Sequence, residues 1–210
     1  INTISSLYNY GIGILILIII TLFIGVFGSL YDDGGINQEI IPLSNEVLAY
    51  EETITKYANQ YNIKEYVPIL EAIMMQESEG KGTDPMNVSE CELNTKYPKA
   101  PNSIQDPNYS IEIGVKYFSN CLKQTNINNL NDINNLYLSL QGYNYGIDYI
   151  KWATQYFDGY SKANAKVYSD NKKAELNKAT FGDPYYVGHV MRYVNFNFRG
   201  TTNPNFNNYD

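Results

Sequence analysis

The chain has 210 residues, of which 44% are hydrophobic and 18% are charged, enough for one compact domain with an appendage. Its net charge of −7 argues against nucleic-acid binding, because a surface that binds a duplex needs clustered cations. One His and two Cys are too few for a structural zinc site, so no metal or cofactor is expected, whereas hydrolysis by paired carboxylates remains open.

The first 31 residues carry no charge and contain a long apolar run. Residues 11–30 read GIGILILIIITLFIGVFGSL, which as a helix of about 30 Å would span a bilayer. We therefore expect a transmembrane anchor over residues 1–31. A cleaved signal peptide is the alternative, although its apolar region is normally shorter, about 7 to 15 residues.

The rest of the chain divides into a linker, a body and a tail. Residues 32–44 contain turn and loop types without periodicity and predict a linker. From Tyr31 to Ser44 the stretched chain reaches at most about 50 Å, so the body is expected to work close to the membrane face. The body is predicted over residues 45–200, and the Asn-rich residues 201–210 are expected to form a disordered polar tail.

The first half of the body predicts two helices. Apolar residues recur at intervals of three and four over 47–61, which is the spacing of one helical face. The same pattern covers 64–78, where Pro68 falls in the first turn and the helix is expected to end near Gly80.

The second half of the body predicts further helices. Asp106 before Pro107 is a cap signal for a third helix, and Asp132 for a fourth that stops near Gly142 and resumes after Gly146. A polar helix is expected over 162–178. Because no stretch alternates with the period of a strand, the predicted fold class is mainly α.

One carboxylate of the second helix stands out for its position. Glu77 lies four residues after Ile73 and three after Met74, so a helix places it on the apolar face. A carboxyl group among apolar neighbours has a raised pKa and can act as a general acid. The alternative is a partly exposed Glu at a helix end, because Gly80 and Gly82 follow.

Four short motifs occur in one order along the body. They are Gln76-Glu77-Ser78, then residues 84–90 (DPMNVSE), then residues 142–146 (GYNYG), and then Tyr185-Tyr186-Val187. In this the chain resembles the goose-type lysozyme and lytic transglycosylase superfamily, and within it the lysozyme-like domain of CwlT-type cell-wall hydrolases of Gram-positive conjugative elements. The resemblance covers roughly residues 45–200 and implies a lysozyme-like helical catalytic domain behind the N-terminal transmembrane helix.

The resemblance also implies roles for individual residues. Glu77 matches the catalytic Glu, and the residues matched to sugar binding are Ser78, Met86, Asn87, Tyr143, Asn144 and Tyr186. Glu79 and Gly142 depart from the usual Gly and Ala. Asn87 replaces Gln, and its side chain, one methylene shorter, can turn a direct hydrogen bond into a water-mediated one.

The second carboxylate of the reaction is left open by the sequence. An inverting glycosidase needs a base about 6.5 to 9.5 Å from the acid, and Asp84 and Glu90 are the main candidates, beside Glu79 and Asp106. If none is in place, the resemblance implies a lytic transglycosylase, in which the 6-hydroxyl of the muramic acid attacks and one acid/base residue suffices.

The two cysteines and the single histidine have structural interpretations. An extracytoplasmic body favours a disulfide between Cys91 and Cys121 over free thiols. A catalytic pair of Cys91 with His189 is disfavoured, because no orienting third residue accompanies it. His189 is expected to be packed or hydrogen-bonded.

These observations lead to one main hypothesis and two alternatives. The main hypothesis is a membrane-anchored N-acetylmuramidase that cuts the β-1,4 bond between N-acetylmuramic acid and N-acetylglucosamine, for local wall opening in conjugative transfer. The alternatives are a lytic transglycosylase and a non-catalytic glycan-binding scaffold of a secretion channel. Expected partners are glycan strands, the membrane, and conjugation or secretion channel proteins. The expected location is the cell membrane, with the domain facing the wall from the extracytoplasmic side.

Overall fold

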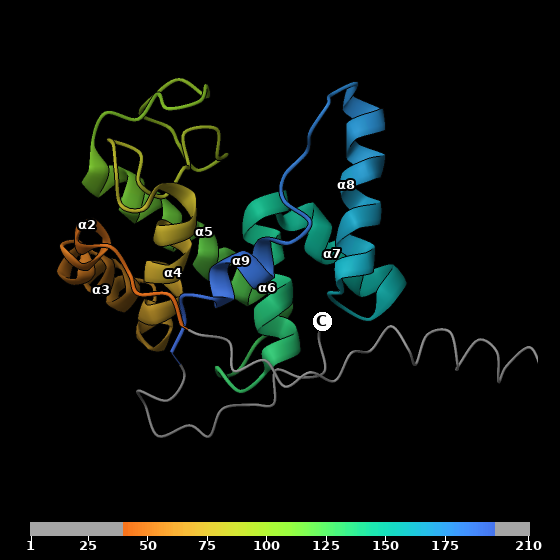
Figure 1. Cartoon of the computed structure of the whole chain (residues 1–210), viewed down its shortest axis with the longest axis horizontal. Helices are drawn as coiled ribbons and strands as arrows, with labels where there is room; N and C mark the ends of the chain where they lie inside the picture. The colour runs from red at the N-terminus through yellow and green to blue at the C-terminus, as the bar shows by residue number, and fades with distance from the viewer. Residues whose placement is uncertain (1–39, 196–210) are drawn as a thin grey trace, which may run out of the picture. The chain divides into compact units, whose positions relative to one another are not determined.

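The structure is a computed structural model that describes residues 40–195 (Figure 1). The predicted anchor, the linker up to residue 39 and the polar tail lie outside the described residues. Among the helices described, none combines the length and the apolar character needed to cross a membrane.

Residues 40–195 form helices joined by loops, which confirms the prediction of a mainly α fold. The elements in chain order are α2 (Asn45–Leu48), α3 (Glu51–Gln60), η1 (Lys64–Tyr66), α4 (Val67–Ser78), α5 (Pro107–Thr125), α6 (Ile133–Tyr145), α7 (Ile147–Phe157), α8 (Lys162–Leu176) and α9 (Tyr186–Met191).

The predicted helix starts are confirmed by their caps. The Asp106 side chain accepts a hydrogen bond from the Asn108 N–H at the start of α5, and Asp132 accepts one from the Asn135 N–H at the start of α6. Each cap satisfies a backbone donor that the first helical turn leaves without a partner.

Two helix predictions were wrong in detail. The helix expected over 47–61 is broken at residues 49–50 into α2 and α3. The helix expected to stop near Gly142 continues through it, and a Cβ at this position would overlap the Ile150 side chain of α7. Gly142 therefore permits close packing of two helices and does not end one.

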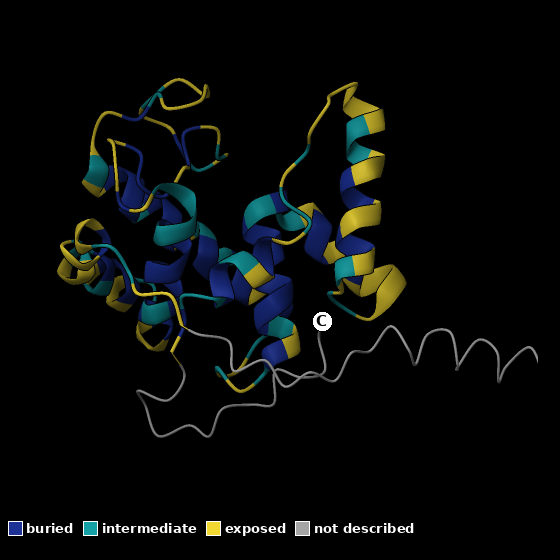
Figure 2. Cartoon of the chain, viewed as in Figure 1, coloured by how far each residue is buried: buried dark blue, intermediate teal, exposed yellow. Residues whose placement is uncertain are grey.

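The core is centred on α4, α5 and α6. α5 packs against α3, α6 and α7, and α9 contacts both α4 and α6 (Figure 1). α4 is buried on nearly every face as far as Met74, as the dark ribbon in Figure 2 shows. Fully burying one large aliphatic side chain stabilises the fold by about 1.5 to 3 kcal/mol. The last turn of α4, which carries Glu77, is therefore held on a rigid support.

Candidate active site

The end of α4 fixes the position of Glu77. After Ser78 the chain turns, with Glu79 in the left-handed conformation (φ 57°) and Gly80 at φ 78°. The Ser78 hydroxyl accepts a hydrogen bond from the Gly80 N–H (3.0 Å) and donates one to the Pro85 carbonyl (2.8 Å). Ser78, predicted to contact sugar, thus ties the helix end to the following loop.

Asp84 organises that loop. Its Oδ1 accepts from the Val88 N–H (3.0 Å) and from the Ser110 hydroxyl of α5 (2.6 Å). Its Oδ2 accepts from the N–H (2.8 Å) and the hydroxyl (2.5 Å) of Ser89. The loop held in this way brings Asn87, at φ 51°, next to Glu77.

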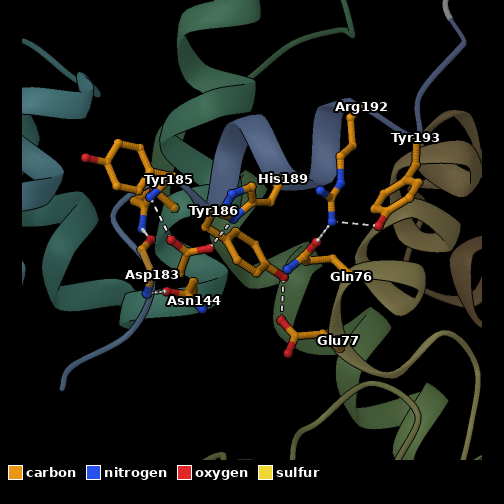
Figure 3. A network of polar contacts seen from close by, with 10 residues as sticks. Gln76, Glu77, Asn144, Asp183, Tyr185, Tyr186, His189, Arg192 and Tyr193 are labelled. Atoms are coloured by element: carbon orange, nitrogen blue, oxygen red, sulfur yellow. Dashed lines mark hydrogen bonds and ion pairs between the residues drawn. The ribbon is translucent and has the colours of Figure 1, made fainter. Parts of the chain in front are cut away.

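Glu77 has a hydrogen-bond donor on each carboxylate oxygen. The Tyr186 hydroxyl donates to Oε1 at 2.5 Å (Figure 3). The Asn87 amide donates to Oε2 at 3.0 Å. Tyr186 is only 2% exposed, whereas Glu77 is half-buried at the helix end. The Asn87 amide thus contacts the Glu77 carboxylate directly, a contact that the sequence did not predict.

The surroundings of Glu77 raise its pKa. Burial is the largest cause and favours the protonated form, and the negative charges of Asp84 and Asp183 act in the same direction. The hydrogen bonds from Tyr186 and Asn87 favour the carboxylate and oppose the rise. Glu77 therefore keeps its proton at higher pH than an ordinary Glu, which is the property that a general acid needs.

Three other residues that were predicted to bind sugar make hydrogen bonds that connect the segments around Glu77. The Tyr143 hydroxyl donates to the Met86 carbonyl at 2.9 Å, and both side chains are buried. Asn144 accepts from the Asp183 N–H at 2.7 Å. These contacts join α6 to the Asp84 loop and to the turn before α9, so they hold Asn87 and Tyr186 in place.

The turn before α9 depends on Asp183, which sequence reasoning missed. Its carboxylate accepts from the Tyr185 N–H (2.8 Å) and pairs with His189 Nδ1 (2.5 Å) (Figure 3). Its carbonyl accepts from the Gln141 amide (2.9 Å). The signal was present: Asp183 precedes Pro184, the same pair that marks the start of α5 at residues 106–107. His189 is hydrogen-bonded, as expected.

The mainly helical fold agrees with the comparison against protein families. The lysozyme-like family model matches residues 44–207. The chain belongs to the lysozyme-like family.

Two curated relatives are longer than the region that they share with this chain. The chain is 35% identical over 161 residues to the bifunctional muramidase/DL-endopeptidase CwlT of Bacillus subtilis (strain 168), covering 77% of this chain and 45% of that protein. It is 29% identical over 147 residues to the uncharacterized membrane protein YocA of the same organism, covering 66% and 61%. The chain thus spans about half the length of these curated relatives.

A solved structure shares the lysozyme-like fold of the body. It is a Staphylococcus aureus subsp. aureus Mu50 protein described as similar to lipoprotein, NLP/P60 family, with a TM-score of 0.62 and 29% sequence identity. The match covers 74% of this chain and 54% of that one.

The four acidic residues considered as a second catalytic carboxylate are either exposed or engaged in hydrogen bonds elsewhere in the domain. Glu79 and Glu90 are exposed, and Glu79 pairs with Lys81. Asp106 caps α5, and Asp84 already accepts four hydrogen bonds from its own loop and α5. Within residues 40–195 no group of three His, Cys, Asp or Glu side chains is arranged to hold a metal ion.

The two cysteines are free thiols in the structure, so the predicted disulfide is not formed there. Cys121 is fully buried in α5, and Cys91 is half-buried in the loop that follows Glu90. Burial raises the pKa of both thiols, which keeps them in the unreactive protonated form.

Proposed function

We propose that this domain is a peptidoglycan glycosidase of the muramidase type, with Glu77 as its general acid. The observation that carries the proposal is the state of Glu77: a half-buried carboxyl with a raised pKa, at the end of a buried helix, with a donor on each oxygen. A 35% identical relative named as a muramidase supports the choice of bond. The substrate is the β-1,4 bond between N-acetylmuramic acid and N-acetylglucosamine.

The two donors to Glu77 assist the proton transfer itself. Glu77 gives its proton to the glycosidic oxygen as the bond to the leaving sugar breaks, and the carboxylate becomes charged. The hydrogen bonds from Tyr186 and Asn87 stabilise that charge, because bonds to an ionised acceptor are stronger than bonds to a neutral one. Burial thus favours protonated Glu77 before the proton transfer, and the two donors stabilise the Glu77 carboxylate after it.

A lytic transglycosylase is the second candidate, favoured by the position of Asp84. All four of its hydrogen bonds come from the loop and α5, so it is poorly placed to activate water. A transglycosylase needs no such base, since the 6-hydroxyl of the muramic acid is the nucleophile and Glu77 alone serves as acid and then base.

Mass spectrometry of the fragments released from purified peptidoglycan separates these candidates. Reducing-end muramic acid, absent with Glu77→Gln, supports the muramidase, and 1,6-anhydro ends support the transglycosylase. Binding to insoluble wall without release by either protein contradicts both and supports a non-catalytic glycan-binding scaffold of a secretion channel.

We also propose that the enzyme acts at the cell membrane, anchored through residues 1–31 with its domain facing the wall. The apolar run at 11–30 and the relative described as a membrane protein support this location. Local wall opening for conjugation or secretion channel proteins would follow from such anchoring. Cleavage of the domain by protease added to intact protoplasts tests the orientation, and protection of the domain contradicts it.

A further inference from the structure

The last five residues of the predicted linker lie on the body of the protein. We call residues 40–44 the entry segment. Its Ile41 N–H donates to the Arg192 carbonyl at 3.0 Å, and Arg192 is the residue that caps the end of α9. The entry segment is therefore joined to the helix that begins with Tyr186.

The same segment is joined to the helix that carries the acid. The Ser44 hydroxyl donates to the Glu79 carbonyl at 2.8 Å, and the Ser44 N–H contacts Met75 Sδ at 3.4 Å. Met75 and Glu79 stand two residues before and two residues after Glu77. The entry segment thus connects the end of α9 to the last turn of α4.

A side-chain link runs beside this connection. Arg192 Nη2 donates to Gln76 Oε1 at 3.1 Å and to the Tyr193 hydroxyl at 2.8 Å. Figure 3 shows α9 reaching the neighbouring residues Gln76 and Glu77 through Arg192 and Tyr186. The carbonyl of Arg192 holds the entry segment, while its guanidinium holds α4.

The helix α9 depends on such contacts for its position. It has six residues and no side-chain hydrogen bond at its N-cap, and a helix this short is not stable alone. Asp183 fixes its start and Arg192 its end. We propose that Ile41 and Ser44 are positioning residues for Glu77, because they hold α9 against α4 in the arrangement that joins the Tyr186 hydroxyl to the acid.

Displacement of α9 has a defined electrostatic consequence for Glu77. The groups that face it are Tyr186 of α9, Asp183 of the preceding turn, Asp84 and Asn87 of the loop, and Tyr143 of α6. Water entering beside α9 removes burial, the largest cause of the raised pKa, while loss of the Tyr186 bond acts in the opposite direction. The net expectation is a pKa closer to that of an ordinary Glu.

The test uses matched proline substitutions in the full chain. Ile41→Pro removes the N–H that donates to Arg192, whereas Ile40→Pro leaves it in place. Carbon-13 NMR titration of the Glu77 carboxyl, without substrate, should give a lower pKa for Ile41→Pro than for Ile40→Pro. With peptidoglycan, Ile41→Pro should lower kcat about fivefold, the equivalent of one hydrogen bond, and leave KM unchanged.

A second pair of variants covers the case in which the proline disturbs folding. Ser44→Ala removes the hydroxyl and should lower the Glu77 pKa and kcat, whereas Ser44→Thr keeps the hydroxyl and should restore both. Equal pKa and kcat values within each pair, in folded proteins, would overturn the proposal. The kinetic measurement rests on the proposed function, but the titration of Glu77 does not. If the wild-type protein releases no fragments from peptidoglycan, the proposed function is rejected. The positioning role of Ile41 and Ser44 can then still be measured through the pKa of Glu77.

Discussion

Glu77 and Asp84 are two acidic residues only seven positions apart, yet their surroundings differ sharply. Glu77 accepts one hydrogen bond on each oxygen, from Tyr186 and Asn87. Asp84 is 8% exposed and accepts four, from backbone amides and hydroxyls of its own loop and of α5. The surroundings of Glu77 leave a carboxyl group that can give up a proton. Those of Asp84 use its carboxylate to hold the loop in one conformation.

The difference teaches that burial alone does not decide the role of a carboxylate, because the number and the origin of its hydrogen-bond donors also matter. Donors to Asp84 come mostly from its own loop, so losing them unfolds the loop. Donors to Glu77 come from α9 and from the loop that Asp84 organises. Asp84 therefore helps to place Asn87, one of the two groups that donate to Glu77.

The largest effect is expected from Glu77→Gln. It removes the acid and should lower the rate of fragment release by about 10²- to 10⁴-fold while the protein stays folded. Glu79→Gln, two residues along and exposed, is the matched control and should retain activity. Equal activity of the two variants would contradict the assignment of Glu77.

Asp84→Asn should act mainly on stability. It places amide hydrogens opposite donors in a buried site, and each unsatisfied buried group costs about 1 to 3 kcal/mol. Urea unfolding should show that Asp84→Asn lowers the free energy of unfolding by that amount, whereas Glu77→Gln changes it little. If Asp84→Asn keeps full stability and loses activity alone, Asp84 takes part in the chemistry and the contrast between the two carboxylates fails.

Tyr186→Phe removes the donor to Glu77 Oε1 and keeps the buried ring. Because that hydrogen bond lowers the pKa of Glu77, its loss should raise the pKa and move the alkaline limb of the kcat/KM profile to higher pH. The rate at the optimum should fall about tenfold, as expected for a bond to a charged group. Tyr185→Phe changes the preceding residue in the chain, which is 52% exposed, and should leave the profile unchanged. A shift to lower pH in Tyr186→Phe contradicts this account.

The smallest effect is expected from Asn87→Gly. Glycine accepts the left-handed backbone of this position without strain, so the change isolates the loss of the amide donor. The longer and more exposed bond, 3.0 Å against 2.5 Å, should be worth less than that of Tyr186. Activity should fall about twofold to fivefold, as for one modest hydrogen bond, and a larger loss than in Tyr186→Phe would reverse the ranking of the two donors.

Local signals in the sequence were sufficient for much of the fold. The caps at Asp106 and Asp132, and the helical face that buries the residues before Glu77, depend on neighbours within a few positions. The helix α9 was not predicted, because six residues show too little periodicity.

The contacts of the site could not be predicted in the same way, since they join distant segments. The bond from Tyr186 to Glu77 spans 109 positions, and that from Ser110 to Asp84 spans 26. The family resemblance pointed to Glu77, Asn87 and Tyr186, which the structure brings together through hydrogen bonds. It did not reveal that Met86, Tyr143 and Asn144 are engaged in hydrogen bonds within the protein.

The most direct test of the central claim is the titration of the Glu77 carboxyl in the wild-type protein by carbon-13 NMR. The resonance is assigned through its absence in Glu77→Gln. The account predicts a pKa above the ordinary value of 4.5, because burial and the charges of Asp84 and Asp183 outweigh the two hydrogen bonds. A pKa at or below 4.5 would contradict it, since Glu77 would then be an ordinary ionised carboxylate and could not serve as the acid near neutral pH.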